Sequence, residues 1–80
     1  MTCYFFNLHE CGTVLEDEEG RELPDLDTAR ATAVADARAI MCAEVAEGRL
    51  CLSCSIVVCD AAGQEVLTVP FKDALVLTGV

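Results

Sequence analysis

The chain has 80 residues, 54% of them hydrophobic, and its five Lys and Arg against 14 Asp and Glu give a net charge of −9. A chain of this length forms a single domain, residues 1–80, and buries only about 60% of its unfolded surface, so oligomerisation is a natural supplement to its stability. The negative charge opposes direct binding to nucleic acid and to anionic membranes, because both require Lys and Arg against phosphate. It permits attraction to a basic protein partner, and it improves solubility.

No basic segment followed by an apolar segment opens the chain, and no apolar run approaches the roughly 18 residues of a membrane span. We therefore expect a cytoplasmic protein. In a reducing cytosol the six cysteines should be free thiols, whereas the same number in a secreted chain of this size would indicate disulfides.

Residues 3–9 alternate with a period of two and predict a β-strand. One face of this strand is apolar and consists of Tyr4, Phe6 and Leu8. Phe5 lies on the opposite face, which is therefore also partly apolar. Gly12 marks a turn, and residues 13–16 predict a short second strand.

One turn pattern occurs twice, in residues 17–23 and in residues 60–66, as Asp-x-x-Gly-x-Glu followed by an apolar residue. Asp opens such a turn because its carboxylate accepts hydrogen bonds from backbone N–H groups farther along the turn. Gly closes it because Gly adopts a positive φ without a Cβ clash. Much of the acidity therefore belongs to turns. A β-branched residue at Gly20 or at Gly63 is expected to destabilise the fold by about the same amount, on the order of 1–2 kcal/mol.

The Ala-rich stretch between the two turns predicts one helix, from about Leu26 to about Glu47. Asp25 suits the N-cap, because its carboxylate can accept hydrogen bonds from the free N–H groups of the first turn, and Gly48 suits the C′ position. The apolar side chains gather on one broad face, which consists of Leu26, Ala33, Val34, Ala37, Ile40, Met41 and Val45. This face is expected to pack on a sheet.

Arg30 interrupts this helix face, because its helical angle places it between Leu26 and Val34. An Arg in an apolar stripe must extend its charged end to water or pair with a carboxylate such as Glu22. The alternative is that Arg30 lines a site for a small anionic ligand or for a protein partner.

Two more strands are predicted after the helix, in residues 53–59 and in residues 65–71. The alternating apolar side chains are Cys54, Ile56 and Val58 in the first and Leu67, Val69 and Phe71 in the second. Pro70 marks a sheet edge or the end of a strand, because it has no N–H group to donate. For residues 71–77 the pattern does not decide between a helical turn and an extended segment.

The order of these elements predicts an α+β fold, ββαββ, in which a four-stranded, largely antiparallel sheet has one long helix packed on one face. A single helix leaves the second face of the sheet uncovered. Phe5, Val57 and Val66 are the apolar residues expected on that second face. Because burying apolar area is favourable, we expect this face to form a homodimer or another protein contact.

Several short motifs occur in an order and spacing that resemble a known family. They are Tyr4-Phe5-Phe6 near the start, Asp17-x-x-Gly20-x-Glu22-Leu23, the Ala/Arg-rich helix after Pro24-Asp25, and Val69-Pro70-Phe71 near the end. The chain is similar over nearly its whole length to short proteobacterial proteins, mostly from alphaproteobacteria, that are classified as a domain of unknown function. The resemblance implies a small cytoplasmic bacterial domain, with no activity, ligand or catalytic residue attached to it.

Cys51-x-x-Cys54 is the motif most specific for a chemistry, because paired thiolates at this spacing can bind zinc or form a redox pair. His9 and Cys11 could complete a four-ligand zinc site. The expected strand around Cys54, however, should turn the Cys51 and Cys54 side chains to opposite faces. Ordinary thiols are therefore favoured over a metal site, and a metal site is favoured over redox chemistry.

No arrangement typical of an active site is present: His9 is the only imidazole, and the chain has no Gly-rich phosphate loop and no paired-His helix. We therefore expect a protein that is not an enzyme and has no cofactor. The leading hypothesis is a non-enzymatic protein-interaction or regulatory module. One alternative, based on the net charge of −9, is an acidic inhibitor or nucleic-acid mimic that binds a basic partner protein. The other is a small thiol or zinc-binding protein.

Overall fold

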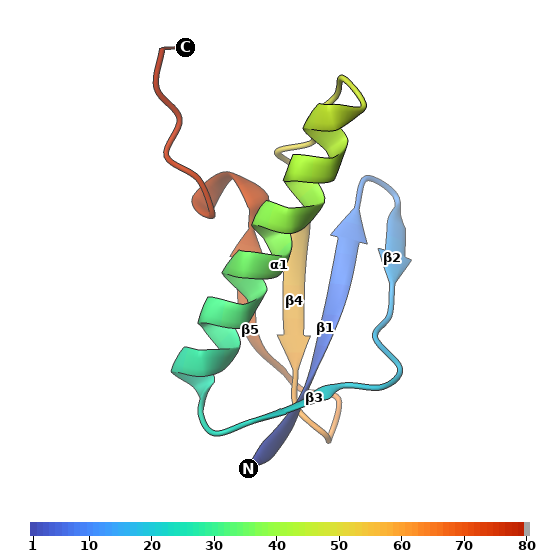
Figure 1. Cartoon of the computed structure of the whole chain (residues 1–80). Helices are drawn as coiled ribbons and strands as arrows, with labels where there is room; N and C mark the ends of the chain where they lie inside the picture. Colours follow the sequence, from blue (N-terminus) through green and yellow to red (C-terminus); the bar gives the residue numbers. More distant parts are fainter. Residues whose placement is uncertain (80) are drawn as a thin grey trace.

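A computed structural model describes residues 1–79 and shows one helix lying across one face of an antiparallel sheet (Figure 1). The elements in chain order are β1 (Thr2–Glu10), β2 (Thr13–Leu15), β3 (Arg21–Leu23), α1 (Leu26–Ala46), β4 (Ser55–Cys59) and β5 (Glu65–Pro70). The strand order is β2-β1-β4-β5, and β3 also pairs with β1. The predicted ββαββ fold is confirmed, with β3 as an additional short strand.

The first strand organises the sheet, because it pairs with three other strands. One edge of β1 pairs with β4, and its other edge pairs with β2 near the end of β1 and with β3 near its start. The sequence pattern predicts no strand at residues 21–23 and indicates only that they lead to the helix. They form β3 because the preceding turn brings the chain back alongside residues 2–4 of β1.

The helix begins as predicted, because the Asp25 carboxylate accepts a hydrogen bond from the Thr28 N–H at 2.8 Å. It ends at Ala46, and Gly48 follows with a φ of 86°. Its N–H group donates to the carbonyl oxygen of Val45, which closes the helix end. No helix within residues 1–79 combines the length and apolarity needed to cross a bilayer.

The buried stripe of α1 consists of small residues and one Met: Ala29, Ala33, Ala37 and Met41. Most of the predicted face is confirmed, because Val34 and Ile40 also pack against the core and only Ala29 was not predicted. Leu26 is 40% exposed and Val45 is 59% exposed; Val45 belongs to the C-terminal end of the helix, which extends past the strands (Figure 1). The alanines let the helix backbone approach the sheet closely, so the large core side chains come from the sheet.

The core lies between α1 and the strands. Its larger side chains are Tyr4, Phe6, Ile56, Val58, Leu67, Val69 and Phe71. Phe71 belongs to a 3-10 turn (Phe71–Asp73) that follows β5, so the segment left open by the sequence pattern begins with a helical turn. The Phe71 N–H group donates to the carbonyl oxygen of Cys54. Arg38 Nε of α1 donates to the carbonyl oxygen of Ala74 at 2.8 Å. These two bonds hold the C-terminal segment against the core.

Candidate functional site

Asp17 joins the first predicted turn to the edge of the sheet. Its Oδ1 atom accepts hydrogen bonds from the N–H groups of Glu19 and Gly20, both at 3.1 Å, as the turn pattern predicts. Its Oδ2 atom accepts a hydrogen bond from the Phe6 N–H, also at 3.1 Å, in the gap between the β2 and β3 pairings of β1. The Asp17 N–H in turn donates to Asn7 Oδ1. A local turn residue therefore also replaces a missing strand partner.

These contacts lower the pKa of Asp17 from its ordinary value of 3.8. Burial alone would raise the pKa of this carboxyl, but the N–H donors of Gly20, Phe6 and Glu19 and the positive charge of Arg21 together outweigh burial. The ionised carboxylate is thus the form that the folded state prefers.

We expect acid to weaken the fold through Asp17. Because its pKa is lower in the folded chain than in the unfolded chain, its contribution is fully present above 3.8 and is lost as the pH falls through the folded value. Urea unfolding of the natural protein and of Asp17→Asn, from about pH 7 down to about pH 2, measures this contribution. The difference between their unfolding free energies should be largest near neutral pH and should shrink in acid. A difference that is constant with pH would contradict the assignment.

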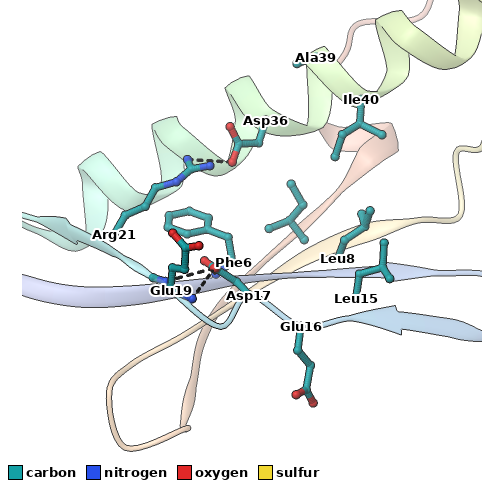
Figure 2. Close-up of a pocket in the computed structure, with 12 residues that line it drawn as sticks. Phe6, Leu8, Leu15, Glu16, Asp17, Glu19, Arg21, Asp36, Ala39 and Ile40 are labelled. Carbon is teal, nitrogen blue, oxygen red and sulfur yellow. Dashed lines mark hydrogen bonds and ion pairs between the residues drawn. The ribbon is translucent and has the colours of Figure 1, made fainter.

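A groove of about 530 Å³ lies between α1 and the β2 side of the sheet (Figure 2). Arg21 reaches across one end of this groove from β3, and its Nη1 atom lies 2.9 Å from Oδ2 of Asp36 on α1. The Arg21 guanidinium also lies 4.9 Å from the centre of the Phe6 ring. Because both ion-pair partners are partly exposed, the pair contributes only about 0–1 kcal/mol of stability.

The Arg21–Asp36 pair is a feature that sequence reasoning missed. The two residues are 15 positions apart and belong to different elements, so no local spacing indicates their contact. The groove lining contains no Ser, Cys or His beside a base, so it does not resemble a nucleophilic active site.

The face of the sheet opposite α1, termed here the open face, has an uncharged centre. The strand registers place on it Phe5, Asn7, His9, Val14, Ser55, Val57, Cys59, Thr68 and Pro70. Glu22 and Glu65 stand at its margins, where Thr68 Oγ1 donates to Glu65 Oε1 at 2.7 Å. Glu16, Asp17 and Asp60 line a hollow beside Phe5, Asn7 and Cys59, so the uncharged area covers the strands themselves and ends where the two turns adjoin them.

The three apolar residues expected on the second face are less exposed than the sequence suggested. Phe5 lies half-buried close to the Gly20 turn, and Val57 is only 8% exposed. Val66 is the extra residue where the pairing of β4 and β5 shifts register, and it packs against the core cluster. The open face therefore presents less apolar area than predicted.

Arg30 does not lie in the buried stripe of α1, so its predicted position is wrong. It is exposed, one residue after the buried Ala29, and within residues 1–79 it forms no ion pair with Glu22. The physical reason is that the buried residues follow one row spaced four positions apart, from Ala29 to Met41, and Arg30 lies about 100° around the helix from Ala29. Arg30 thus belongs to the solvated face of the helix.

Three of the four residues weighed as metal ligands or redox thiols come together. Cys54 Sγ lies 2.7 Å from Cys51 Sγ, and Cys11 Sγ lies 3.9 Å from Cys51 Sγ. The expectation that Cys51 and Cys54 point to opposite faces is wrong, because β4 begins only at Ser55 and the segment before it bends. Ser53 Oγ, which sequence reasoning did not single out, lies 3.0 Å from Cys11 Sγ and 3.3 Å from Cys51 Sγ.

The neighbouring thiols shift the pKa values of Cys51 and Cys54 in opposite directions. The hydrogen bond from Cys54, together with the hydroxyl and N–H groups of Ser53, lowers the pKa of Cys51 from 9.0 to about 7. Burial, followed by the hydrogen bond to Cys51 and the charge of its thiolate, raises the pKa of Cys54 to about 12. Cys51 is therefore the more acidic thiol of the pair, and Cys54 donates the hydrogen bond between them.

In this arrangement the two closest thiols lie nearer to one another than two thiolate ligands of one zinc ion. Two thiolates on a tetrahedral zinc, with Zn–S bonds of about 2.3 Å, lie roughly 3.8 Å apart, whereas Cys51 Sγ and Cys54 Sγ are separated by 2.7 Å. Within residues 1–79, no group of three or more His, Cys, Asp or Glu side chains is arranged to hold a metal ion. His9 lies on β1 between Val14 and Ser55 of the neighbouring strands.

The fold and these features define a small two-layer α+β domain, with one helix on an antiparallel sheet, an open face and a cluster of thiols at one end. The chain belongs to the family described as domain of unknown function DUF6894, which matches residues 3–72. Neither the curated proteins nor the solved structures contain a significant match to it.

Proposed function

We propose that this protein is a non-enzymatic interaction module that self-associates through the open face of its sheet. The observation that carries the proposal is the uncharged centre of that face, which runs from Phe5 and Asn7 on β1 across Val57 on β4 to Thr68 on β5. Charged side chains are depleted at the centres of protein interfaces, because a buried charge without a partner is costly.

The size of the molecule is compatible with such an interface. Its extents are 40 × 24 × 17 Å, so its broad faces can bury the roughly 800 Å² per partner that is typical of stable interfaces. A second copy is the favoured partner, because a two-fold axis lets one face meet itself. A short chain with an alanine-rich helix also gains most from the additional buried area.

The distribution of the acids favours this module over an acidic inhibitor or nucleic-acid mimic. A mimic needs carboxylates gathered on one face at phosphate-like spacing. Here Asp17, Asp25 and Asp60 each accept hydrogen bonds from backbone N–H groups in turns or at the helix start. Asp36 pairs with Arg21. These four of the 14 acidic side chains are thus used locally.

We expect sedimentation equilibrium at moderate salt to give about twice the chain mass of 8.5 kDa. Salt should strengthen the dimer, because two copies that each carry −9 repel one another. Thr68→Glu should weaken it at least about ten-fold in Kd, because Thr68 is exposed on the open face and a buried carboxylate beside that of Glu65 would lack a partner.

Ala35→Glu is the matched control, because it adds the same charge at an exposed position of α1. It should leave the dimer intact. Equal effects of the two variants would show that the interface does not lie on the open face. A monomer at high protein concentration and moderate salt would contradict self-association.

We also propose a cytoplasmic location and a proteobacterial source. The location is supported by the six cysteines, all of which are free thiols. The source rests on the resemblance carried by Tyr4-Phe5-Phe6 and the motifs that follow it. Fractionation of host cells tests the location, and recovery of the protein from the periplasm or the medium would argue against it.

A further inference from the structure

The thiol cluster of Cys11, Cys51 and Cys54 is assembled by two loops that meet at one end of the sheet. Cys11 lies in the turn between β1 and β2, and the other two lie in the loop between α1 and β4 (Figure 1). The two loops are far apart in sequence, yet Ser53 Oγ lies within 3.3 Å of both the Cys11 and the Cys51 sulfur atoms. The cluster is therefore a product of the fold and not only of the Cys-x-x-Cys spacing.

A hollow of about 250 Å³ gives solvent access to this cluster. It is lined by Glu10, Cys11, Glu44, Arg49, Leu50, Cys51 and Cys54. The Oε1 atom of Glu44 is buried and, within the described residues, has no hydrogen-bond partner. An unpartnered carboxylate oxygen beside thiols is costly as a purely structural feature. It can serve as an acceptor for a proton released in the hollow.

We infer that the cluster is a peroxide-reactive dithiol site in which Cys51 is the attacking sulfur and Cys54 is the resolving sulfur, joined on oxidation by a Cys51–Cys54 disulfide. The geometry carries this inference, since the two sulfur atoms are only 2.7 Å apart and Cys51 lines a solvent-accessible hollow. This site is independent of the proposed interface on the open face.

The reaction balances in two steps. The Cys51 thiolate attacks one oxygen of a hydroperoxide, the O–O bond breaks, and the leaving oxygen takes a proton to form water or an alcohol. Cys51 then carries a sulfenic acid, oxidised by two electrons. Cys54 loses its proton and attacks the Cys51 sulfur, the S–O bond breaks, and the departing hydroxide takes up a proton to leave as water. The products are one disulfide and the reduced peroxide.

The division of roles between the two thiols follows from their environments. The pKa of Cys51 is lowered to about 7, so close to half of it is thiolate at neutral pH. The pKa of Cys54 is raised to about 12 by burial and also by the hydrogen bond to Cys51 and its charge. Oxidation of Cys51 removes its negative charge, so part of the barrier to ionising Cys54 disappears when Cys54 is needed.

Cys11 provides an alternative partner for the oxidised Cys51. Its sulfur lies 3.9 Å from Cys51 Sγ, within reach of a side-chain rotation, and it is exposed. When Cys54 is replaced, we expect the Cys51 sulfenic acid either to persist or to form a disulfide with Cys11.

The test is to treat fully reduced, untagged protein with about one equivalent of hydrogen peroxide and to map the disulfides by mass spectrometry. The expected product is a single chain, not cross-linked to another, that has lost two hydrogen atoms and holds a Cys51–Cys54 bond, which dithiothreitol reverses. In Cys54→Ser, a sulfenic acid trapped by dimedone on Cys51, or a Cys11–Cys51 bond, is expected. A disulfide that joins other cysteines, or random oxidation of all six, would overturn the inference.

Alkylation by iodoacetamide at about pH 7 gives a second measurement that does not depend on peroxide. A pKa of about 7 in place of 9.0 raises the thiolate fraction about fifty-fold. The lower nucleophilicity of each thiolate offsets this roughly ten-fold, so Cys51 should react about five-fold faster than an ordinary thiol. This faster reaction of one thiol, the fast phase of alkylation, should vanish in Cys51→Ser and in urea. It should remain in Cys42→Ser, the control on the exposed side of α1. A fast phase that survives Cys51→Ser would refute the assignment of Cys51.

Discussion

We expect Gly20→Ala to lower the free energy of unfolding by about 2–4 kcal/mol. Gly20 has a φ of 74°, a conformation that costs Ala about 1 kcal/mol or more. A Cβ atom there would also lie 2.7 Å from Cys3 Sγ and 3.0 Å from the Phe5 ring, so these side chains must move. Because Gly20 is held by Asp17 against the sheet edge, the turn has little freedom to shift away. Urea unfolding measures the loss.

Gly63→Ala is the matched control in the second copy of the turn. Gly63 has a similar φ of 82°, but nothing lies within 4 Å of its added Cβ atom. We therefore expect a loss of only about 1 kcal/mol, from the backbone conformation alone. The equal costs predicted from the shared sequence pattern are thus replaced by unequal ones. In a Cys3→Ala background the cost of Gly20→Ala should fall. Equal losses at the two glycines would disprove the close approach at Gly20.

Phe71→Ala should lower the free energy of unfolding by about 3–5 kcal/mol, because it removes a large buried side chain and leaves a cavity. Phe71 is 1% exposed and is one of the two largest fully buried side chains within residues 1–79. A chain of this length has a total stability of about 4–12 kcal/mol, so the variant should be close to unfolding at room temperature. A thermal melt followed by circular dichroism, together with a urea titration, measures the loss.

Leu77→Ala provides the control for Phe71, because it shortens a side chain in the same C-terminal segment that is 48% exposed. Its effect should stay within about 0.5 kcal/mol. A loss below about 1 kcal/mol for Phe71→Ala would show that Phe71 does not close the core.

The features that the sequence determined by itself are those made by neighbouring residues. Asp25 caps α1, and Asp17 and Asp60 open turns that Gly20 and Gly63 close at positive φ. Each depends on a side chain and a backbone group only a few positions apart, so local chemistry is sufficient to predict it. Together with the period-two segments, these signals also specify the ββαββ order.

The tertiary structure decided every feature that depends on residues far apart in the chain. Which row of α1 is fully buried depends on how the helix crosses the sheet, which its own periodicity does not encode, and Arg30 therefore lies beside the buried row and not within it. The ion pair of Arg21 with Asp36 depends on the formation of β3.

The thiol cluster depends on the same kind of long-range placement. Cys51 and Cys54 meet because β4 begins two residues later than the pattern predicts, and Cys11 joins them because β1 and α1 end at the same end of the sheet. Loop contacts of this kind are set by the packing of the elements that the loops connect. The sequence alone therefore identified the thiols as candidates, and only the fold brought them within reach of one another.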